Sequence, residues 1–127
     1  MRALRWALPI FYMGFIFVAS SVPGDDLPSW GLWDKAEHLL AYSVLGVFFL
    51  VPVAEARLAL VTVRTGAIAV LLATLYGAFD EIHQAFTPGR SPDIHDLFAD
   101  FLGAALGVAC VLLLRVVLTR LSPRRVV

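Results

Sequence analysis

Apolar residues occur in four long runs that short polar segments separate, near residues 5–22, 35–54, 66–86 and 94–118. Each run allows a helix of about 20 residues, which is enough to cross a hydrocarbon core of about 30 Å. The second and third runs reach this length only when their polar ends are included. The pattern therefore predicts an all-α integral membrane bundle of four transmembrane helices, formed as a single domain over residues 1–127.

The first run has a second interpretation, because it also resembles a signal peptide. Arg2 and Arg5 precede the apolar stretch, and the Ala-Ser-Ser sequence at residues 19–21 resembles a small-residue cleavage site. However, the stretch over residues 6–18 is long and aromatic for a signal peptide, and a Pro-Gly-Asp-Asp break follows it as a loop would. We therefore interpret the first run as a retained span.

The composition agrees with a membrane protein. Of the 127 residues, 60% are hydrophobic and only 16% are charged, and the mean hydropathy is +0.83. A soluble domain of this length would need a more polar surface than this sequence supplies. The formal net charge is zero and no basic stripe stands out, so we expect no nucleic-acid partner. The single cysteine, Cys110, cannot form an internal disulfide.

Positively charged residues predict the orientation of the spans. Arginines occur before the first run, between the second and third, and after the fourth: Arg2, Arg5, Arg57, Arg64, Arg115, Arg120, Arg124 and Arg125. The positive-inside rule assigns these segments to the cytoplasm. The other two connections carry mainly acids and should face outward. Both chain termini are therefore predicted to be cytoplasmic.

Polar side chains recur at helical spacing near the predicted outer ends of three runs. These stripes are Asp34, His38 and Tyr42 in the second run, Tyr76, Asp80 and Gln84 in the third, and Asp96 and Asp100 in the fourth. In the fourth run, Gly103 and Gly107 continue the same line. The two glycines form a small-xxx-small packing face. Because charged groups that face lipid are costly, we expect the acids to point into the bundle.

Some polar residues also have purely structural interpretations. Asp34 with Glu37 resembles a capping box, and Asp93 after Ser91-Pro92 resembles a helix start. The structural interpretation of His38 and His83 is that they are histidines at the membrane interface whose ring nitrogens are hydrogen-bonded. Asp80 and Glu81 are harder to explain as scaffold, because adjacent carboxylates at this depth repel each other.

The Thr87-Pro88-Gly89-Arg90 segment predicts a type II turn. Arg90 should then lie above the acids, where it either closes an internal salt bridge or holds an anionic lipid head group. Trp6, Trp30 and Trp33 are most simply interfacial anchors.

The order of these motifs resembles the VanZ-like family of small bacterial membrane proteins. The resemblance covers roughly residues 5–118 and rests on Asp34-Lys35-x-x-His38 with Tyr42 and Gly46, Glu81-x-x-Gln84, Pro88-Gly89-Arg90-Ser91 and Asp96-x-x-x-Asp100-x-x-Gly103. Family members commonly carry Asn at the position of Asp100, so the acid here adds negative charge.

The resemblance implies a cell-envelope role in the bacterial cytoplasmic membrane. The family is named for a protein that accompanies glycopeptide-resistance genes and raises resistance to teicoplanin-type antibiotics. The positions that match its polar pattern are Lys35, His38, Glu81, Gln84, Arg90 and Asp96.

We favour a binding or accessory protein over two alternatives. Its outward polar pocket would hold a membrane lipid head group or a lipid-linked envelope precursor and modulate glycopeptide susceptibility. We expect neither a cofactor nor a metal. The ligand-binding residues would be Lys35, His38, Tyr42, Asp80, Glu81, Gln84, Arg90, Asp96 and Asp100.

The first alternative is a membrane hydrolase or transferase that acts on a lipid-linked envelope substrate. Its catalytic candidates are Glu81, His38 and Asp80, and a divalent metal held by Asp80, Asp96 and Asp100 would assist them. The second alternative is a proton-coupled carrier with a relay of Asp80, Glu81 and Asp100, for which a homodimer would supply the missing internal repeat. A salt-bridge cluster with a structural role only is the simplest alternative to all three.

Overall fold

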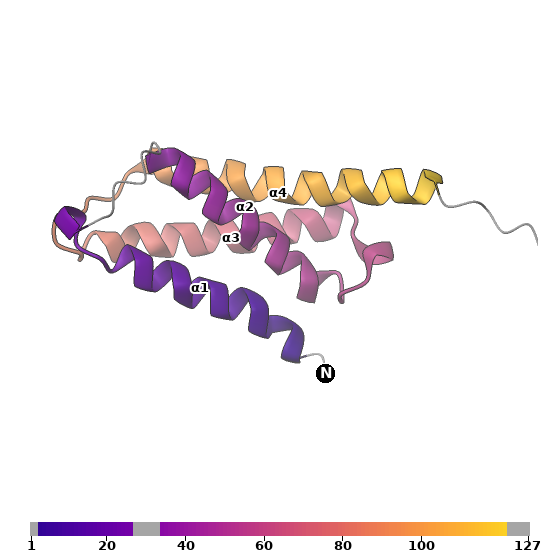
Figure 1. The fold of residues 1–127 in the computed structure, drawn as a ribbon, viewed down its shortest axis with the longest axis horizontal. Helices are drawn as coiled ribbons and strands as arrows, with labels where there is room; N and C mark the ends of the chain where they lie inside the picture. The colour runs from indigo at the N-terminus through magenta and orange to yellow at the C-terminus, as the bar shows by residue number, and fades with distance from the viewer. Residues whose placement is uncertain (1–2, 27–33, 122–127) are drawn as a thin grey trace, which may run out of the picture.

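The computed structural model describes residues 3–26 and 34–121, which form four α-helices of alternating direction (Figure 1). A 3-10 turn, η1 (Ala3–Trp6), leads into α1, and the other three helices follow in order. The helices are α1 (Ala7–Ser20), α2 (Asp34–Val53), α3 (Val63–Gln84) and α4 (Ile94–Leu121). The start of α1 and the end of α4 lie at the same end of the bundle. The predicted all-α architecture is confirmed, with helix ends that differ from the apolar runs by only a few residues.

All four helices are suited to a membrane. The segments Ala3–Ser20, Asp34–Val53, Val63–Gln84 and Ile94–Leu121 are each long and apolar enough to cross a bilayer. Large apolar side chains on their outer faces are exposed, as Phe11, Phe79 and Leu113 illustrate. Lipid tails solvate such faces, whereas the helical backbone satisfies its own hydrogen bonds. The bundle has the surface of a multi-pass membrane protein.

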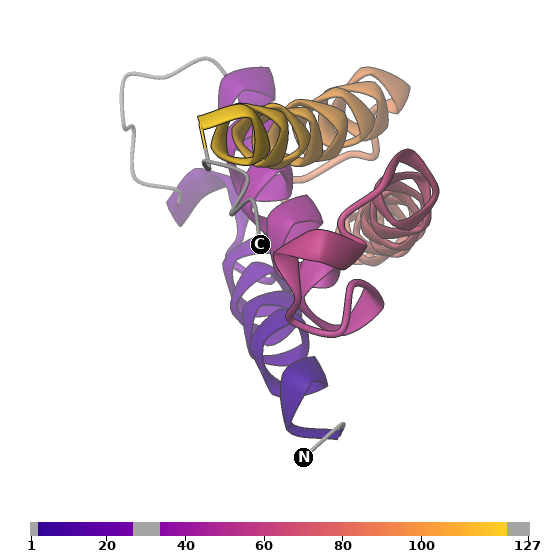
Figure 2. The ribbon, with the colours of Figure 1, turned by 90° about the vertical axis from the view of Figure 1, so that its right-hand side faces the viewer.

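The second helix occupies the centre of the bundle. It packs along both α3 and α4, whereas α1 contacts α2 and α3 from the outside of this three-helix group (Figure 2). The Tyr76 hydroxyl donates a hydrogen bond of 2.6 Å to the Met13 carbonyl and thereby joins α3 to the middle of α1. A specific hydrogen bond thus joins the first helix to the rest of the bundle.

Glycines allow α2 and α4 to approach closely. A Cβ atom at Gly103 or Gly107 would collide with the carbonyl oxygens of Leu39 and Ser43 on α2. From the other side, a Cβ atom at Gly46 would lie 2.9 Å from the Cα of Ala104. These contacts confirm the small-xxx-small packing face that the sequence predicts on the fourth span.

The two connections at the polar end contact each other. Gly89 has a φ of 72°, and the Arg90 N–H donates to the Thr87 carbonyl at 3.1 Å, which are both features of the predicted type II turn. The N–H of Gly24 donates to the Pro88 carbonyl at 3.0 Å, so the segment after α1 is held against this turn.

Several expectations concern residues outside the described ranges. The interfacial anchors Trp30 and Trp33, and the arginines Arg2, Arg124 and Arg125, belong to this group. Trp6 is described, and its ring lies edge-on to Phe49 with centroids 6.3 Å apart. The orientation of the bundle in the membrane stays a prediction.

Candidate functional site

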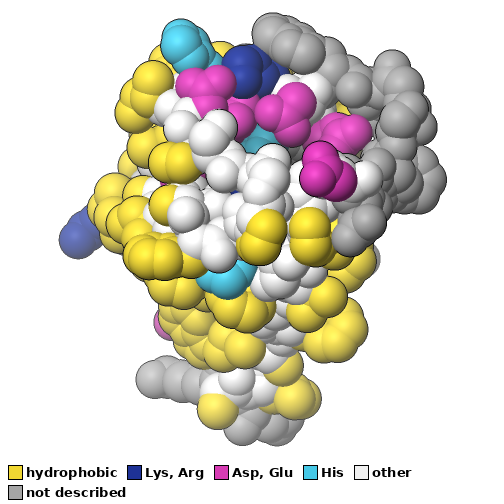
Figure 3. Space-filling view, turned by 90° about the vertical axis from the view of Figure 1, so that its left-hand side faces the viewer, with side chains coloured by type: hydrophobic (Ala, Val, Ile, Leu, Met, Phe, Trp, Pro, Cys, Tyr) yellow, Lys and Arg dark blue, Asp and Glu magenta, His cyan; other side chains and the backbone are white. Residues whose placement is uncertain are grey.

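One end of the bundle is strongly acidic, and we call it the polar end. It is the end where α1 and α3 finish and α2 and α4 begin, and it carries nine of the ten Asp and Glu residues of the chain. The same segments contain two basic residues of the Lys and Arg type, Lys35 and Arg90. Figure 3 shows acidic side chains gathered on this end beside basic and histidine side chains, with hydrophobic surface around them. The zero net charge of the chain therefore conceals a marked excess of negative charge at one end.

Lys35 links α2 to the start of α4. Its Nζ donates to Oδ2 of Asp93 at 2.8 Å and to Oδ1 of Asp96 at 2.7 Å. Asp93 also caps α4, because its Oδ1 accepts the His95 N–H at 2.9 Å. The hydrogen bond from Lys35, together with those from His95, holds the pKa of the Asp93 carboxyl well below its usual range. A helix start in the Ser91-Pro92-Asp93 segment is confirmed, but α4 begins at Ile94, so Asp93 rather than Ser91 is the cap. The pairing of Asp93 with Lys35 was not predicted.

A buried histidine–acid group lies between α2, α3 and α4. Nδ1 of His38 lies 2.9 Å from Oδ1 of Asp100, whose side chain is completely buried. Oε2 of Glu81 accepts the backbone N–H of Asp93 at 2.7 Å. The absence of a side chain at Gly77 leaves room for Asp100, because a Cβ there would lie 2.5 Å from Oδ2. The acids of the third and fourth spans do point into the bundle, as expected.

Three buried polar atoms in this group and in the neighbouring Tyr42, whose ring stacks with that of His38, have no hydrogen-bond partner among the described residues. They are the Tyr42 hydroxyl, Oε1 of Glu81 and Oδ2 of Asp100. Buried polar atoms are normally paired, since each unpaired one costs on the order of 1–3 kcal/mol. These atoms therefore identify the part of the polar end where hydrogen-bonding capacity is unused.

Asp80 belongs to a separate, fully paired group. The Ser20 hydroxyl donates to its Oδ1 at 2.6 Å, and Nε2 of Gln84 donates to its Oδ2 at 3.1 Å. Asp80 is buried, so these two bonds satisfy both oxygens without a cation. Sequence reasoning missed Ser20, for which the available signal was the Ser20-Ser21 pair at the end of the first apolar run.

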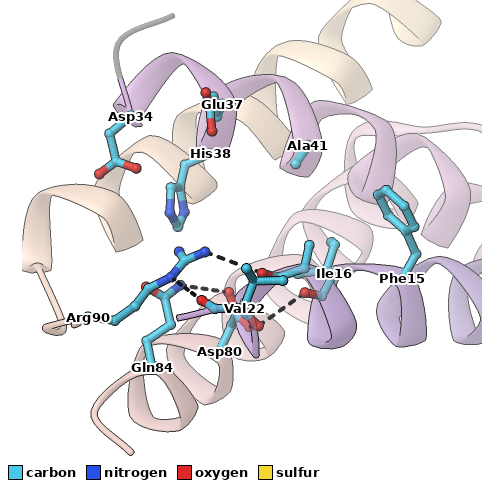
Figure 4. A pocket seen from close by; sticks show the side chains of 12 residues that line it. Phe15, Ile16, Val22, Asp34, Glu37, His38, Ala41, Asp80, Gln84 and Arg90 are labelled. Carbon is cyan, nitrogen blue, oxygen red and sulfur yellow. Dashed lines mark hydrogen bonds between the residues drawn. The ribbon is translucent and has the colours of Figure 1, made fainter. Parts of the chain in front are cut away.

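A pocket of about 340 Å³ opens between α1, α2 and α3 (Figure 4). Four of the predicted site residues line it: His38, Asp80, Gln84 and Arg90. The other five predicted residues are not part of the lining and belong to the polar groups behind it: Lys35, Tyr42, Glu81, Asp96 and Asp100. The remaining lining residues are Phe15, Ile16, Ala19, Ser20, Val22, Asp34, Glu37 and Ala41. The contribution of α1 to this pocket was not predicted.

Arg90 does not form the internal salt bridge that was one of its two expected roles. Its Nε donates to the Val22 carbonyl and its Nη2 to the Ala19 carbonyl, both at 3.2 Å. No carboxylate of the described residues lies within 4.0 Å of its guanidinium nitrogens. Arg90 thus satisfies free carbonyls at the end of α1, and Figure 4 shows its guanidinium pointing into the pocket toward His38.

The structural interpretations of His83 and Asp34 have different outcomes. Nε2 of His83 lies 2.9 Å from the Ser21 hydroxyl, and its ring stacks on Phe17 with centroids 4.2 Å apart. His83 is therefore a packed histidine at the surface of the bundle. Asp34 is the exposed first residue of α2 and makes no hydrogen bond with Glu37, so the capping box is not seen among the described residues. Asp34 instead lines the pocket.

The metal ligands suggested for the enzyme alternative are not the ones that converge. Among the described residues, His, Asp and Glu donor atoms come within 4.8 Å of one another in two groups of three. These groups are His38, Glu81 and Asp100, and Asp34, His38 and Asp96. Asp80 belongs to neither, because its oxygens face Ser20 and Gln84.

Comparisons with known proteins identify the family. Neither the search of curated proteins nor the search of solved structures found a match. A family model described as VanZ/LLP1 matches residues 6–115, which include α1 to α3 and most of α4. Because this match extends over nearly the whole chain and agrees with the motif order, the chain belongs to the VanZ/LLP1 family of multi-pass membrane proteins.

Proposed function

We propose that the pocket binds the zwitterionic head group of an envelope lipid, or of a lipid-linked envelope precursor that carries the same phosphate and amine chemistry. The observation that supports this best is the distribution of charge across the pocket. Arg90 lies on one wall, and the acids Asp34 and Glu37 lie on the opposite wall (Figure 4). A head group with one negative and one positive charge complements both walls.

Arg90 is suited to the phosphate. A guanidinium group has five N–H donors in a planar fork, which matches the oxygens of a phosphate. The carbonyls of Val22 and Ala19 use two of these donors and also fix the direction of the side chain. The remaining donors are available to a ligand, and the fixed side chain loses little conformational entropy on binding.

Asp34 and Glu37 are suited to the amine. Neither carboxylate has a hydrogen-bond or salt-bridge partner within the described part of the chain. They belong to the first turn of α2, where the helix dipole favours negative charge. An ammonium group that enters the pocket would therefore find two uncompensated acids on one wall.

The apolar part of the pocket is suited to the lipid tails. Phe15 and Ile16 of α1 and Ala41 of α2 line the side of the pocket that faces the membrane-spanning part of the bundle. Phe15 is well exposed, so its ring is available to an acyl chain. Binding of a head group above and of acyl chains along α1 would give the pocket specificity for an intact lipid rather than a free head group.

This function is consistent with an accessory role in the cell envelope. If the polar end faces outward, the pocket opens at the level of the outer leaflet of the bacterial cytoplasmic membrane, where lipid-linked envelope precursors are used. Sequestration or presentation of such a lipid would connect the protein to glycopeptide susceptibility. This link depends on the predicted outward orientation of the polar end.

Native mass spectrometry of the purified protein tests the lipid proposal. The full chain is released gently from micelles that contain equal amounts of phosphatidylethanolamine and phosphatidylglycerol. We expect retained phosphatidylethanolamine, at least tenfold less in Arg90→Ala, and partial recovery in Arg90→Lys. Arg64→Ala removes an exposed arginine at the opposite end of the bundle and should have no effect. Equal retention by wild type and Arg90→Ala would contradict the proposal.

A second candidate function is supported by the pair of His38 and Asp100. His38 lines the pocket, and its Nδ1 lies within hydrogen-bond distance of Oδ1 of Asp100. A carboxylate in this position orients an imidazole that acts as a general base. Under this alternative, the bound lipid should change in mass with time. His38→Gln should then abolish the conversion and leave lipid retention in place. An unchanged lipid mass in the wild type would contradict the enzyme alternative.

A further inference from the structure

We propose that His38, Glu81 and Asp100 form a binding site for a divalent first-row transition cation such as Zn²⁺ or Mn²⁺. The three side chains come from α2, α3 and α4, and each offers one donor atom within 4.8 Å of the other two. Imidazole nitrogen and carboxylate oxygen are common ligands of such ions in proteins. This site is distinct from the head-group contacts of Arg90, Asp34 and Glu37, and it does not rest on lipid binding.

Two carboxylate oxygens in this group are held in position but have no partner. Oε1 of Glu81 and Oδ2 of Asp100 are buried and make no hydrogen bond with any described residue. The opposite oxygens are fixed, since Oε2 of Glu81 accepts the Asp93 N–H at 2.7 Å and Oδ1 of Asp100 lies 2.9 Å from His38. Glu81 is 6% exposed and Asp100 is fully buried, so bulk water does not solvate the free oxygens. A bound cation would supply the positively charged partner that these two carboxylates lack.

The charge of the group points to a cation rather than to an anion or a neutral ligand. Lys35 is already held between Asp93 and Asp96, and Arg90 donates to backbone carbonyls. Among the described residues, Glu81 and Asp100 therefore have no Lys or Arg partner. Two buried carboxylates with at most one imidazolium leave uncompensated negative charge in a low-dielectric region. A divalent ion would neutralise both carboxylates.

The geometry requires only a small adjustment. Ligands about 2.1 Å from a tetrahedral ion lie about 3.4 Å from one another. Because the donor atoms lie within 4.8 Å of one another, the widest pair must converge by at most about 1.4 Å. Rotation of the His38 ring, and of the Glu81 carboxylate about the hydrogen bond between its Oε2 and the Asp93 N–H, can supply this movement, while Gly77 keeps space for the Asp100 carboxylate. The other donor group is less suited, because Asp34 is exposed and Lys35 already pairs with Asp96.

Metal binding by the full chain in detergent micelles tests this proposal. After chelator treatment and removal of any affinity tag, Zn²⁺ and Mn²⁺ binding is measured by calorimetry, and retained metal is measured by elemental mass spectrometry. We expect one ion per chain, and at least tenfold weaker binding in Glu81→Gln and Asp100→Asn. Absence of binding to the wild type, or equal binding by these variants, would overturn the proposal.

Two control variants separate the site from general acidity. Asp80→Asn removes a buried carboxylate next to Glu81, and both oxygens of this Asp80 carboxylate are hydrogen-bonded. Asp25→Asn removes an exposed acid at the same end of the bundle. Both should retain one ion per chain. Loss of the ion in Asp25→Asn would indicate a diffuse surface effect and would contradict the assigned site.

A measurement on a variant with unchanged carboxylates covers the case in which Glu81→Gln or Asp100→Asn fails to fold. The chain has three histidines, and His83 and His95 lie outside the proposed site. In the double variant His83→Gln/His95→Gln, His38 is the remaining imidazole. Pulsed electron paramagnetic resonance of bound Mn²⁺ should still detect nitrogen coupling. Loss of this coupling would assign the ion to a surface histidine and overturn the proposal, whatever the outcome of the lipid experiments.

Discussion

Ser20 at the end of α1 donates a hydrogen bond of 2.6 Å to Oδ1 of Asp80 on α3, and both residues are buried. This bond joins the helix with the fewest polar residues to the acidic end of the bundle. It also leaves Asp80 with a partner for each oxygen, since Gln84 donates to Oδ2. The result is a wall of the pocket built from two helices that are far apart in the sequence.

Substitution of Ser20 by alanine should destabilise the bundle through this bond. Ser20→Ala leaves Oδ1 of Asp80 buried without a donor, which costs about 1–3 kcal/mol. We expect a lower midpoint of thermal unfolding in detergent micelles. Ser21→Ala is the matched control, because its contact with His83 is exposed and its loss should change stability by less than about 0.5 kcal/mol. Equal effects of the two substitutions would show that the Ser20 bond is not important for stability.

Much of the fold could be predicted from the sequence, because the apolar runs are long and because charged groups that face lipid are costly. Four apolar runs of membrane-spanning length predict four helices almost irrespective of detail, and the acid stripes predict inward-facing carboxylates because lipid-facing charge is costly. The Pro-Gly pair similarly predicted the turn, since Gly89 supplies the positive φ that the turn requires.

The candidate site was less predictable because its contacts depend on how the helices cross. Spacing places Asp80 and Asp100 on inward faces, but it does not determine that Asp80 meets Ser20 whereas Asp100 meets His38. Arg90 illustrates a second limit. Its partners are the backbone carbonyls of Val22 and Ala19. Because every residue has a backbone carbonyl, the sequence does not indicate which ones Arg90 contacts.

The close packing of α2 on α4 predicts a sharp difference between two glycine substitutions. In Gly103→Ala, the new methyl group would collide with the Leu39 carbonyl, which should cost about 1–3 kcal/mol and lower the unfolding midpoint. In Gly14→Ala, the new methyl group meets nothing within 4 Å, so better helix propensity should stabilise α1 by up to about 1 kcal/mol. Thermal unfolding of both variants in the same micelles measures the difference. A neutral Gly103→Ala variant would contradict the close approach of these helices.

The ion pair of Asp93 and Lys35 predicts a stability contribution that depends on pH. The folded protein lowers the pKa of Asp93 from its ordinary value of 3.8, mainly through Lys35, so folding favours the charged carboxylate. The contribution is therefore fully present above about pH 4 and is lost as the pH falls through the lowered pKa. Asp93→Asn should reduce the unfolding midpoint near neutral pH, and its effect should shrink below about pH 4. A difference between wild type and variant that does not change with pH would argue against the ion pair.

The charge distribution predicts that the polar end faces away from the cytoplasm. Eight arginines flank the opposite ends of the helices in the sequence, where a single acid, Glu55, occurs with them. In a Cys110→Ser background, a membrane-impermeant maleimide should label Ser91→Cys in intact spheroplasts, because Ser91 is exposed in the α3–α4 connection. Leu58→Cys, in the exposed connection at the other end, should be labelled only after the membrane is permeabilised. The reverse labelling pattern would show that the bundle has the opposite orientation in the membrane. It would also move the pocket to the cytoplasmic leaflet, where the same head-group chemistry would have to serve a different lipid pool.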